Sequence, residues 1–217
     1  MTKQKAFLFD LNGTMIDDMD FHIRAWYDIL NGLGAKISME QTKAECYGKN
    51  DELLERTFPG RFSAAEKTKM SYAKETAYQE TFRPSLALLP GLDAFLSAAA
   101  EKKIAMAIGS AAIRFNIDFV LDGLSIRHYF PVIVAAEDVR LSKPDPETYL
   151  SCAAQLGVAN ADCIVFEDSP KGVQAAERAG MQSVVLTTLH TPDEFSHCNN
   201  VLFFVKDYLD PQLNNIL

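Results

Sequence analysis

Short apolar runs alternate along the chain with longer segments in which apolar positions recur every three to four residues. The short runs have the length of buried strands and cover residues 5–10, 104–109, 132–136, 163–167, 183–187 and 201–205. Helical patterns fill the segments 92–102, 112–123, 146–156 and 170–179. Continuous apolar strands separated by helices are typical of a parallel sheet that is covered on both faces. The pattern therefore predicts an α/β fold with a doubly wound, Rossmann-like parallel sheet.

One long stretch departs from this alternation. Residues 17–88 contain no convincing strand, and their apolar positions instead predict helices at 19–33, 39–45, 51–58 and 64–82. The chain returns to the sheet pattern at Leu89-Pro90-Gly91, a turn-prone sequence. We therefore predict a Rossmann-like core built from residues 1–16 and 89–217, with a small helical domain inserted at 17–88.

Composition and charge narrow the classes of partner. The 217 residues are 48% hydrophobic and 23% charged, and 29 acidic against 21 basic residues give a net charge of −8. An acidic chain without a basic block predicts neither nucleic-acid nor membrane binding, and no apolar run approaches the roughly 20 residues of a membrane span. The four cysteines form no disulfide or zinc pattern. The N-terminus leads directly into a strand pattern, so we expect no signal peptide and a cytoplasmic location.

Polar side chains follow the predicted strands at their carboxyl ends. Asp10 ends the first strand, Ser110 follows the second, Lys143 lies in the loop after the third, and Glu167 and Asp168 end the fourth. Ligands of open parallel sheets bind outside these strand ends. We therefore expect the five side chains to converge on one edge of the sheet.

These residue types suit phosphoryl transfer. Asp10 and Asp168 offer the oxygen ligands that Mg²⁺ prefers, and an aspartate can also attack phosphorus to form an aspartyl phosphate. Lys143 would reduce the repulsion between the anions, while Ser110 would hold phosphoryl oxygens. Each residue type, taken alone, is more often a turn former, a solvated charge or a helix cap. Their occurrence in this order at successive strand ends favours the chemical interpretation.

Four motifs carry a resemblance to a known family. They are FLFDLNGTMIDD at 7–18, AIGSA at 107–111, SKPDPETY at 142–149 and VFEDSPKGVQAA at 165–176. With these motifs in order, the chain resembles the haloacid dehalogenase superfamily, and within it the β-phosphoglucomutase-like phosphatases with a helical cap. The likeness covers essentially the whole chain. It implies a Mg²⁺-dependent phosphohydrolase for a small phosphorylated metabolite, in which residues 17–88 form the cap and a monomer can be active.

The resemblance also implies roles for the residues of the first and fourth motifs. Asp10 would be the nucleophile and a Mg²⁺ ligand, and Asn12 would offer its backbone carbonyl to the metal. Asp168 would be the second carboxylate ligand, with Glu167 beside it and acting through water. Thr14 would support the loop.

Further roles follow for the sheet edge and for the cap. Ser110 would bind the transferring phosphoryl group, and Lys143 would neutralise both that group and Asp10. Candidate substrate contacts, besides Thr14, are Ala111, Arg114, His22, Trp26 and Lys49. His22 and Trp26 belong to the segment DFHIRAW, which is similar to the cap entry of the mutases.

The chain departs from the family pattern at one catalytic position. Asn12 stands where the family carries a second aspartate that acts as general acid and base. An asparagine cannot exchange a proton in that way, and such help is worth about 10²–10⁴ in rate. Substrates with good leaving groups should be affected least. His22 could instead take over the proton transfer.

Three alternatives therefore stay open. The chain could be a phosphate- or metabolite-binding protein with impaired turnover. It could be a phosphonatase-like C–P hydrolase, with Lys49 forming a Schiff base. It could also be a sugar-phosphate mutase, although Asp51 stands about where the mutases carry a basic residue.

Overall fold

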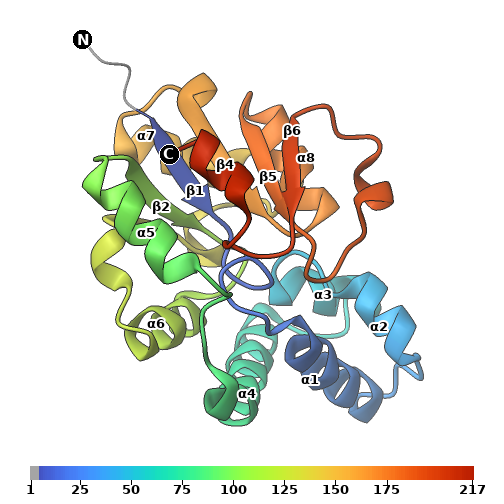
Figure 1. The fold of residues 1–217 in the computed structure, drawn as a ribbon. Coiled ribbons are helices and arrows are strands. Elements are labelled where there is room, and N and C mark those ends of the chain that lie inside the picture. Colours follow the sequence, from blue (N-terminus) through green and yellow to red (C-terminus); the bar gives the residue numbers. More distant parts are fainter. Residues whose placement is uncertain (1–4) are drawn as a thin grey trace. The chain divides into compact units, whose positions relative to one another are not determined.

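A six-stranded sheet forms the centre of the larger part of the protein (Figure 1). The computed structural model describes residues 5–217, so the first four residues of the predicted core segment 1–16 lie outside it. Every strand pairs with its neighbours in parallel, in the order β3-β2-β1-β4-β5-β6. The strands are β1 Ala6–Phe9, β2 Ala105–Gly109, β3 Val132–Val134, β4 Cys163–Glu167, β5 Gln182–Leu186 and β6 Val201–Val205. This is the Rossmann-like parallel sheet that the hydrophobic pattern predicts.

The strand order fixes where a ligand site can form. The chain builds the sheet outward from β1 through β2 to β3, then returns to the other side of β1 and continues through β4, β5 and β6. The order therefore reverses between β1 and β4. Connections leave these two strands in opposite directions, which opens a crevice outside their carboxyl ends.

Alternate residues of β1 pack against two different layers. Ala6 and Leu8 belong to a buried cluster that includes residues of α7 and α8, while Phe7 and Phe9 contact the ring of Phe95 on the other face. This alternation follows from the two-residue period of a strand. The helices of this part are α5 Leu92–Glu101, α6 Arg114–Gly123, α7 Glu147–Leu156 and α8 Pro170–Arg178. Both faces of the central strands are therefore buried, as their continuous apolar sequences require.

The second part of the chain is helical. The protein divides into two compact units. The helical unit is Asp18–Leu86, and the core unit consists of the described chain up to Asp17 together with Ala87–Leu217. The helical unit contains α1 Met19–Gly32, α2 Met39–Glu45, α3 Asn50–Thr57 and α4 Ala64–Phe82. Trp26 and Leu30 of α1 pack on Leu53 and Leu54 of α3 in its buried centre.

Each of these helices and strands lies within two residues of its predicted bounds. Two elements differ by two residues: α6 begins at Arg114 rather than at residue 112, and the third strand ends at Val134 rather than at residue 136. Ala136–Asp138 forms a short 3₁₀ turn, and the Asp138 carboxylate accepts a hydrogen bond from the Ala135 backbone N–H at 2.8 Å. The local side chain therefore removes the donor that the strand would need to continue. Within residues 5–217, none of the helices combines the length and apolar character that crossing a bilayer demands.

Candidate active site

Asp10 leaves the end of β1 and is followed by a tight loop. Its backbone N–H donates to the carbonyl of Phe166 in the neighbouring β4 at 2.9 Å. The N–H groups of Thr14 and Met15 then both turn back to the Leu11 carbonyl, at 3.3 and 2.9 Å. The turn needs a residue whose backbone lies in the left-handed region, and Gly13 adopts it with φ of 72°. The Asn-Gly pair thus fixes the shape of the loop that carries Asp10 and Asn12.

Three distant segments hold this loop by its carbonyl oxygens. The Thr188 hydroxyl, beyond β5, donates to the Gly13 carbonyl at 2.6 Å. The Tyr208 hydroxyl donates to the Thr14 carbonyl at 3.2 Å, and the Leu89 N–H donates to the Met15 carbonyl at 2.8 Å. The loop is therefore fixed on the core unit by donors from three other parts of the chain.

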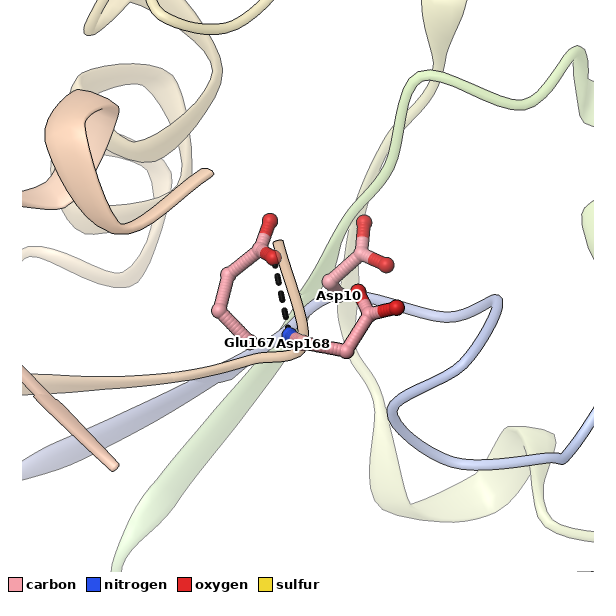
Figure 2. Close-up of side chains that lie close together, drawn as sticks. All are labelled: Asp10, Glu167 and Asp168. Atoms are coloured by element: carbon pink, nitrogen blue, oxygen red, sulfur yellow. Dashed lines mark hydrogen bonds between the residues drawn. The ribbon is translucent and has the colours of Figure 1, made fainter. Parts of the chain in front are cut away.

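The end of β4 brings two more carboxylates to the same place. Asp10, Glu167 and Asp168 are all buried, and each offers an oxygen within 4.8 Å of the others. We call these three residues the carboxylate cluster. Figure 2 shows the carboxyl groups of Asp10 and Asp168 on the same side of the strand ends, with that of Glu167 turned to the other side. The Thr14 hydroxyl lies 3.5 Å from Oδ1 of Asp168.

A single buried lysine bridges two members of the cluster. Lys143 Nζ donates to Oδ1 of Asp10 at 2.6 Å and to Oε1 of Glu167 at 2.7 Å. Burial alone would lower the pKa of Lys143, but the charges of the two carboxylates outweigh it and raise the pKa above its usual value. Lys143 is therefore a permanent cation at neutral pH.

Both oxygens of Glu167 are surrounded by donors. Oε1 accepts from Lys143 and from the Tyr149 hydroxyl at 2.9 Å. Oε2 accepts from the N–H groups of Asp168 and Ser169 and from the Ser169 hydroxyl, at 2.8 to 2.9 Å. Burial acts to raise the pKa of Glu167, but Lys143 and these hydrogen bonds hold the pKa below its usual range. Glu167 is thus an ionised anchor for Lys143.

Gly172 explains how the Glu167 carboxylate fits against α8. A Cβ atom at position 172 would lie 1.7 Å from Oε1 of Glu167, which no side chain can tolerate. The Gly172 N–H donates to the Ser169 hydroxyl at 3.1 Å, so the same turn caps the helix and contacts the carboxylate. Glycine at this position therefore makes room for the anchor.

The carboxylate cluster suits a divalent cation. Three carboxylates and one ammonium leave these four groups with a formal charge of −2, in a site where all four are buried. Buried charges need compensation, and hard oxygen ligands are those that Mg²⁺ prefers. Since the oxygens of Glu167 already accept five hydrogen bonds, Asp10 and Asp168 are the carboxylates that fit direct ligation, with Glu167 beside them.

The predicted residues after β2 lie at the same edge of the sheet. Ser110 is buried, and its hydroxyl oxygen accepts from the Ala112 N–H at 3.1 Å; Ala111 lies half-buried between them. Arg114 begins α6, forms an ion pair with Asp138 and donates to the Ile133 carbonyl at 3.1 Å. Arg114 therefore uses its guanidinium within the core unit, whereas Ser110 stands at the end of the strand next to β1.

The predicted cap residues lie within the helical unit. His22 Nε2 is 3.2 Å from Oδ2 of Asp18, and Nδ1 is 2.5 Å from Lys74 Nζ. Because an ammonium can only donate, Nδ1 accepts and Nε2 carries the proton. Both ring nitrogens of His22 are therefore engaged inside this unit. Trp26 is buried in its apolar centre, and Lys49 is the residue that precedes α3.

Three residues that contact the site are not among those that the sequence predicts. Tyr149 touches Glu167 and Lys143, while Thr188 and Tyr208 hold the loop after Asp10. Burial and the neighbouring carboxylates raise the pKa of both tyrosines well above its usual value, so each hydroxyl stays a donor. Tyr149 lies inside the SKPDPETY motif and could have been suspected from it. Thr188 and Tyr208 carry no local signal.

Known proteins resemble this chain in sequence. Residues 7–186 match the family model described as haloacid dehalogenase-like hydrolase. The fructose-1-phosphate phosphatase YqaB of Escherichia coli (strain K12) is 31% identical over 177 residues, which are 82% of this chain and 93% of that protein. The β-phosphoglucomutase of Bacillus subtilis (strain 168) is 31% identical over 187 residues, which are 83% of this chain and 82% of that protein.

Solved structures agree with these matches. The structure of β-phosphoglucomutase from Clostridium difficile superimposes with a TM-score of 0.84 at 27% identity, covering 98% of this chain and 96% of that one. The match extends over the sheet and over the helical segment, so it concerns the whole described chain. Together with the family model, it shows that this chain belongs to the haloacid dehalogenase-like hydrolases.

Proposed function

We propose that the chain is a Mg²⁺-dependent phosphohydrolase of a small phosphate ester, most simply a sugar or polyol phosphate, and that it acts through an aspartyl phosphate on Asp10. One observation carries the proposal. Asp10, at the end of β1, is held 2.6 Å from the buried ammonium of Lys143 and beside the carboxylates of β4. This geometry pairs a carboxylate nucleophile with the positive charge that an incoming phosphate needs.

In the first half of the reaction, a carboxylate oxygen of Asp10 would attack phosphorus, and the bond from phosphorus to the ester oxygen would break. Lys143 would offset the charge on the transferring group, and the Ser110 hydroxyl would bind one of its oxygens. The alcohol would leave with the bonding electrons and collect a proton from water. In the second half, water would attack phosphorus, release phosphate and restore Asp10.

A metal ion would be held by Asp10, Asp168 and the backbone carbonyl of Asn12. When bound, Mg²⁺ supplies positive charge that orients the phosphate and stabilises its transition state. The residues support this assignment because the cluster is buried, made of hard oxygen ligands and formally anionic. The hydrogen bonds from the Thr188 and Tyr208 hydroxyls to the loop after Asp10 would keep the Asn12 carbonyl at its position.

Asn12 sets the expected substrate range. Its amide can donate and accept hydrogen bonds but cannot protonate the leaving alcohol. His22 engages both its ring nitrogens within the helical unit, so the contacts give it no place as the replacement acid. We therefore expect slow turnover of alkyl phosphates and faster turnover of phosphates with acidic leaving groups.

The test compares three proteins with Mg²⁺: the unmodified chain, Asp10→Asn and Asn12→Asp. Phosphate release would be measured from p-nitrophenyl phosphate and from a panel of sugar and polyol phosphates. We expect Asp10→Asn to lower the rate on the order of 10⁴-fold. We expect Asn12→Asp to raise the rate on sugar phosphates by up to about 10²–10⁴-fold, and to raise that on p-nitrophenyl phosphate much less.

The same assay separates the alternatives. Equal rates for the unmodified chain and Asp10→Asn would reject hydrolysis through Asp10 and favour a binding protein. Conversion of a sugar phosphate into its isomer, with no release of phosphate, would indicate a mutase; the match to β-phosphoglucomutase of Bacillus subtilis is the observation that favours this second candidate. Cleavage of phosphonoacetaldehyde that depends on Lys49 would indicate a phosphonatase.

A further inference from the structure

Tyr149 of α7 contacts both partners of the central ion pair. Its side chain is fully buried, and its hydroxyl donates to Oε1 of Glu167 at 2.9 Å. The ammonium of Lys143 lies 4.7 Å from the centroid of its ring. A single side chain thus touches the lysine by its aromatic face and the carboxylate that anchors the lysine by its hydroxyl.

The lysine needs such support. Lys143 reaches its partners on a flexible four-carbon stem that ends in a compact, rotatable charge. It stands between two competing acceptors at nearly equal distances, 2.6 Å to Asp10 and 2.7 Å to Glu167. Small changes at either acceptor would therefore shift the ammonium toward the other one.

The hydroxyl of Tyr149 binds one of the two carboxylates that accept from Lys143, namely Glu167. Lys143 and Tyr149 are the two donors that the described residues place on Oε1 of Glu167, which matches the two lone pairs of that oxygen. Gly172 packs against the carboxylate from α8, and three donors hold its other oxygen. Without the hydroxyl, Oε1 would keep a buried acceptor site, and Lys143 is the donor that the described residues still place against it.

We infer that Tyr149 is a positioning residue that keeps the ammonium of Lys143 directed toward Asp10. The hydroxyl occupies the acceptor site that would otherwise draw the ammonium onto Glu167, and the aromatic face lies against the ammonium. The kinetic consequence rests on the proposed function. The placement of the ammonium does not, so it can be tested separately.

The variant that isolates this role is Tyr149→Phe. Phenylalanine keeps the ring, its packing and its face toward Lys143, and it removes only the hydroxyl. The matched control is Ala153→Gly, on the same helix and in the same buried cluster. Ala153 is placed in neither the catalytic nor the binding machinery, and a glycine there weakens the helix without changing a contact of Lys143 or Glu167.

Two measurements are made on the full chain. The first separates kcat from KM for p-nitrophenyl phosphate at saturating Mg²⁺. The second is ¹⁵N NMR of the lysine ammonium groups, in which the Lys143 signal is assigned by its loss in Lys143→Met and its hydrogen exchange with water is timed. A held ammonium with two charged partners exchanges slowly enough to be observed.

We expect Tyr149→Phe to lower kcat on the order of 10-fold to 100-fold, the range for a hydrogen bond to a charged group, with KM changed less than about twofold. The exchange of the Lys143 ammonium should accelerate on the order of 10-fold. Ala153→Gly should lower the melting temperature and leave both quantities unchanged.

The inference is overturned if Tyr149→Phe leaves the ammonium exchange at its original rate, if Ala153→Gly reproduces the loss in kcat, or if the unmodified chain shows no slowly exchanging Lys143 signal. Absence of phosphatase activity in the unmodified chain would instead reject the proposed function, and the NMR comparison would still decide the role of Tyr149.

Discussion

Each unit of this protein buries one lysine among acidic groups, and the two arrangements differ in charge and in connectivity. In the core unit, Lys143 bridges two carboxylates that come from different strands, and Asp168 adds a third. In the helical unit, Lys74 bridges an imidazole and the Glu75 carboxylate. The core cluster has a formal charge of −2. The helical groups Asp18, Lys74 and Glu75 sum to −1, with His22 neutral.

The partners of the two lysines show what this difference means. Asn50 donates to Glu75 at 2.8 Å, Tyr78 donates to Asp18, and the Tyr78 ring stacks on His22. These neutral groups come from α1, α3 and α4 of one small unit and contact three members of its cluster, while Oε2 of Glu75 is buried without a hydrogen-bond partner among the described residues. The carboxylate cluster instead concentrates negative charge at the strand ends. The core unit therefore carries the larger uncompensated charge and gathers it at the edge of the sheet, whereas the helical unit spreads a smaller charge over the start of α1 and over α4.

Replacing each lysine by methionine should have the largest effect and separates the two arrangements. Either change leaves buried carboxylates without their cation, which costs about 3–5 kcal/mol of unfolding free energy. Lys143→Met should also lower kcat about 10²–10³-fold, because it removes the charge next to the nucleophile. Lys74→Met should lower kcat much less. Hydrogen exchange, read separately on peptides of α1 and α4 and of β1 and β4, should localise each loss.

The Lys74 variant also has a pH signature. Burial by itself would raise the pKa of Glu75, but the charge of Lys74 and the hydrogen bonds from Asn50 and Lys74 keep the pKa below its usual value. A lowered pKa adds stability above the unfolded pKa of about 4.3 and loses it as pH falls further. Without Lys74 the carboxylate takes up a proton more readily, so the difference in stability should narrow between about pH 7 and pH 4. A difference that stays constant would contradict this assignment.

Magnesium should stabilise the two units unequally. At a concentration of 100 times its Kd, a ligand that binds only the folded state adds about 2.7 kcal/mol. We expect this gain in the unmodified chain and in Glu75→Gln, and we expect Asp168→Asn to lose it. Calorimetric titration and thermal unfolding with and without Mg²⁺ measure the effect. If Asp168→Asn keeps the gain, or Glu75→Gln loses it, the cation does not bind at the carboxylate cluster.

Removing the hydroxyl of Thr188, which holds the loop after Asp10, should give the smallest effect. Thr188→Val removes the hydrogen bond to the Gly13 carbonyl, worth about 1 kcal/mol, and should lower kcat/KM about fivefold. Thr187→Val is the matched control, because the Thr187 hydroxyl donates at 3.3 Å to Val205, away from the loop. Equal losses of kcat/KM in both variants would show that the Thr188 hydroxyl contributes to general stability rather than to the position of the loop that carries Asp10.

Local patterns account for most of the fold. The strands are continuous apolar runs because both faces of the sheet are covered, and α2 and α4 start at recognisable caps, Ser38 and Ser63. The rule that ligands bind outside the strand ends likewise predicts that Asp10, Lys143, Glu167 and Asp168 lie together. For Thr188 and Tyr208 no local pattern applies, because their hydroxyls reach a loop more than 170 residues earlier in the chain.

Glu167 shows the difference between what the sequence predicts and what the tertiary structure decides. By itself, the sequence determined an α/β chain with a helical insertion, the order of its strands along the chain, and an acidic pair that follows one of them. Only the tertiary structure decided that both oxygens of Glu167 would be filled, by Lys143, Tyr149 and the turn into α8. The physical reason is that local periodicity depends on near neighbours, whereas the number of donors around a buried carboxylate depends on segments that meet only after the sheet has formed.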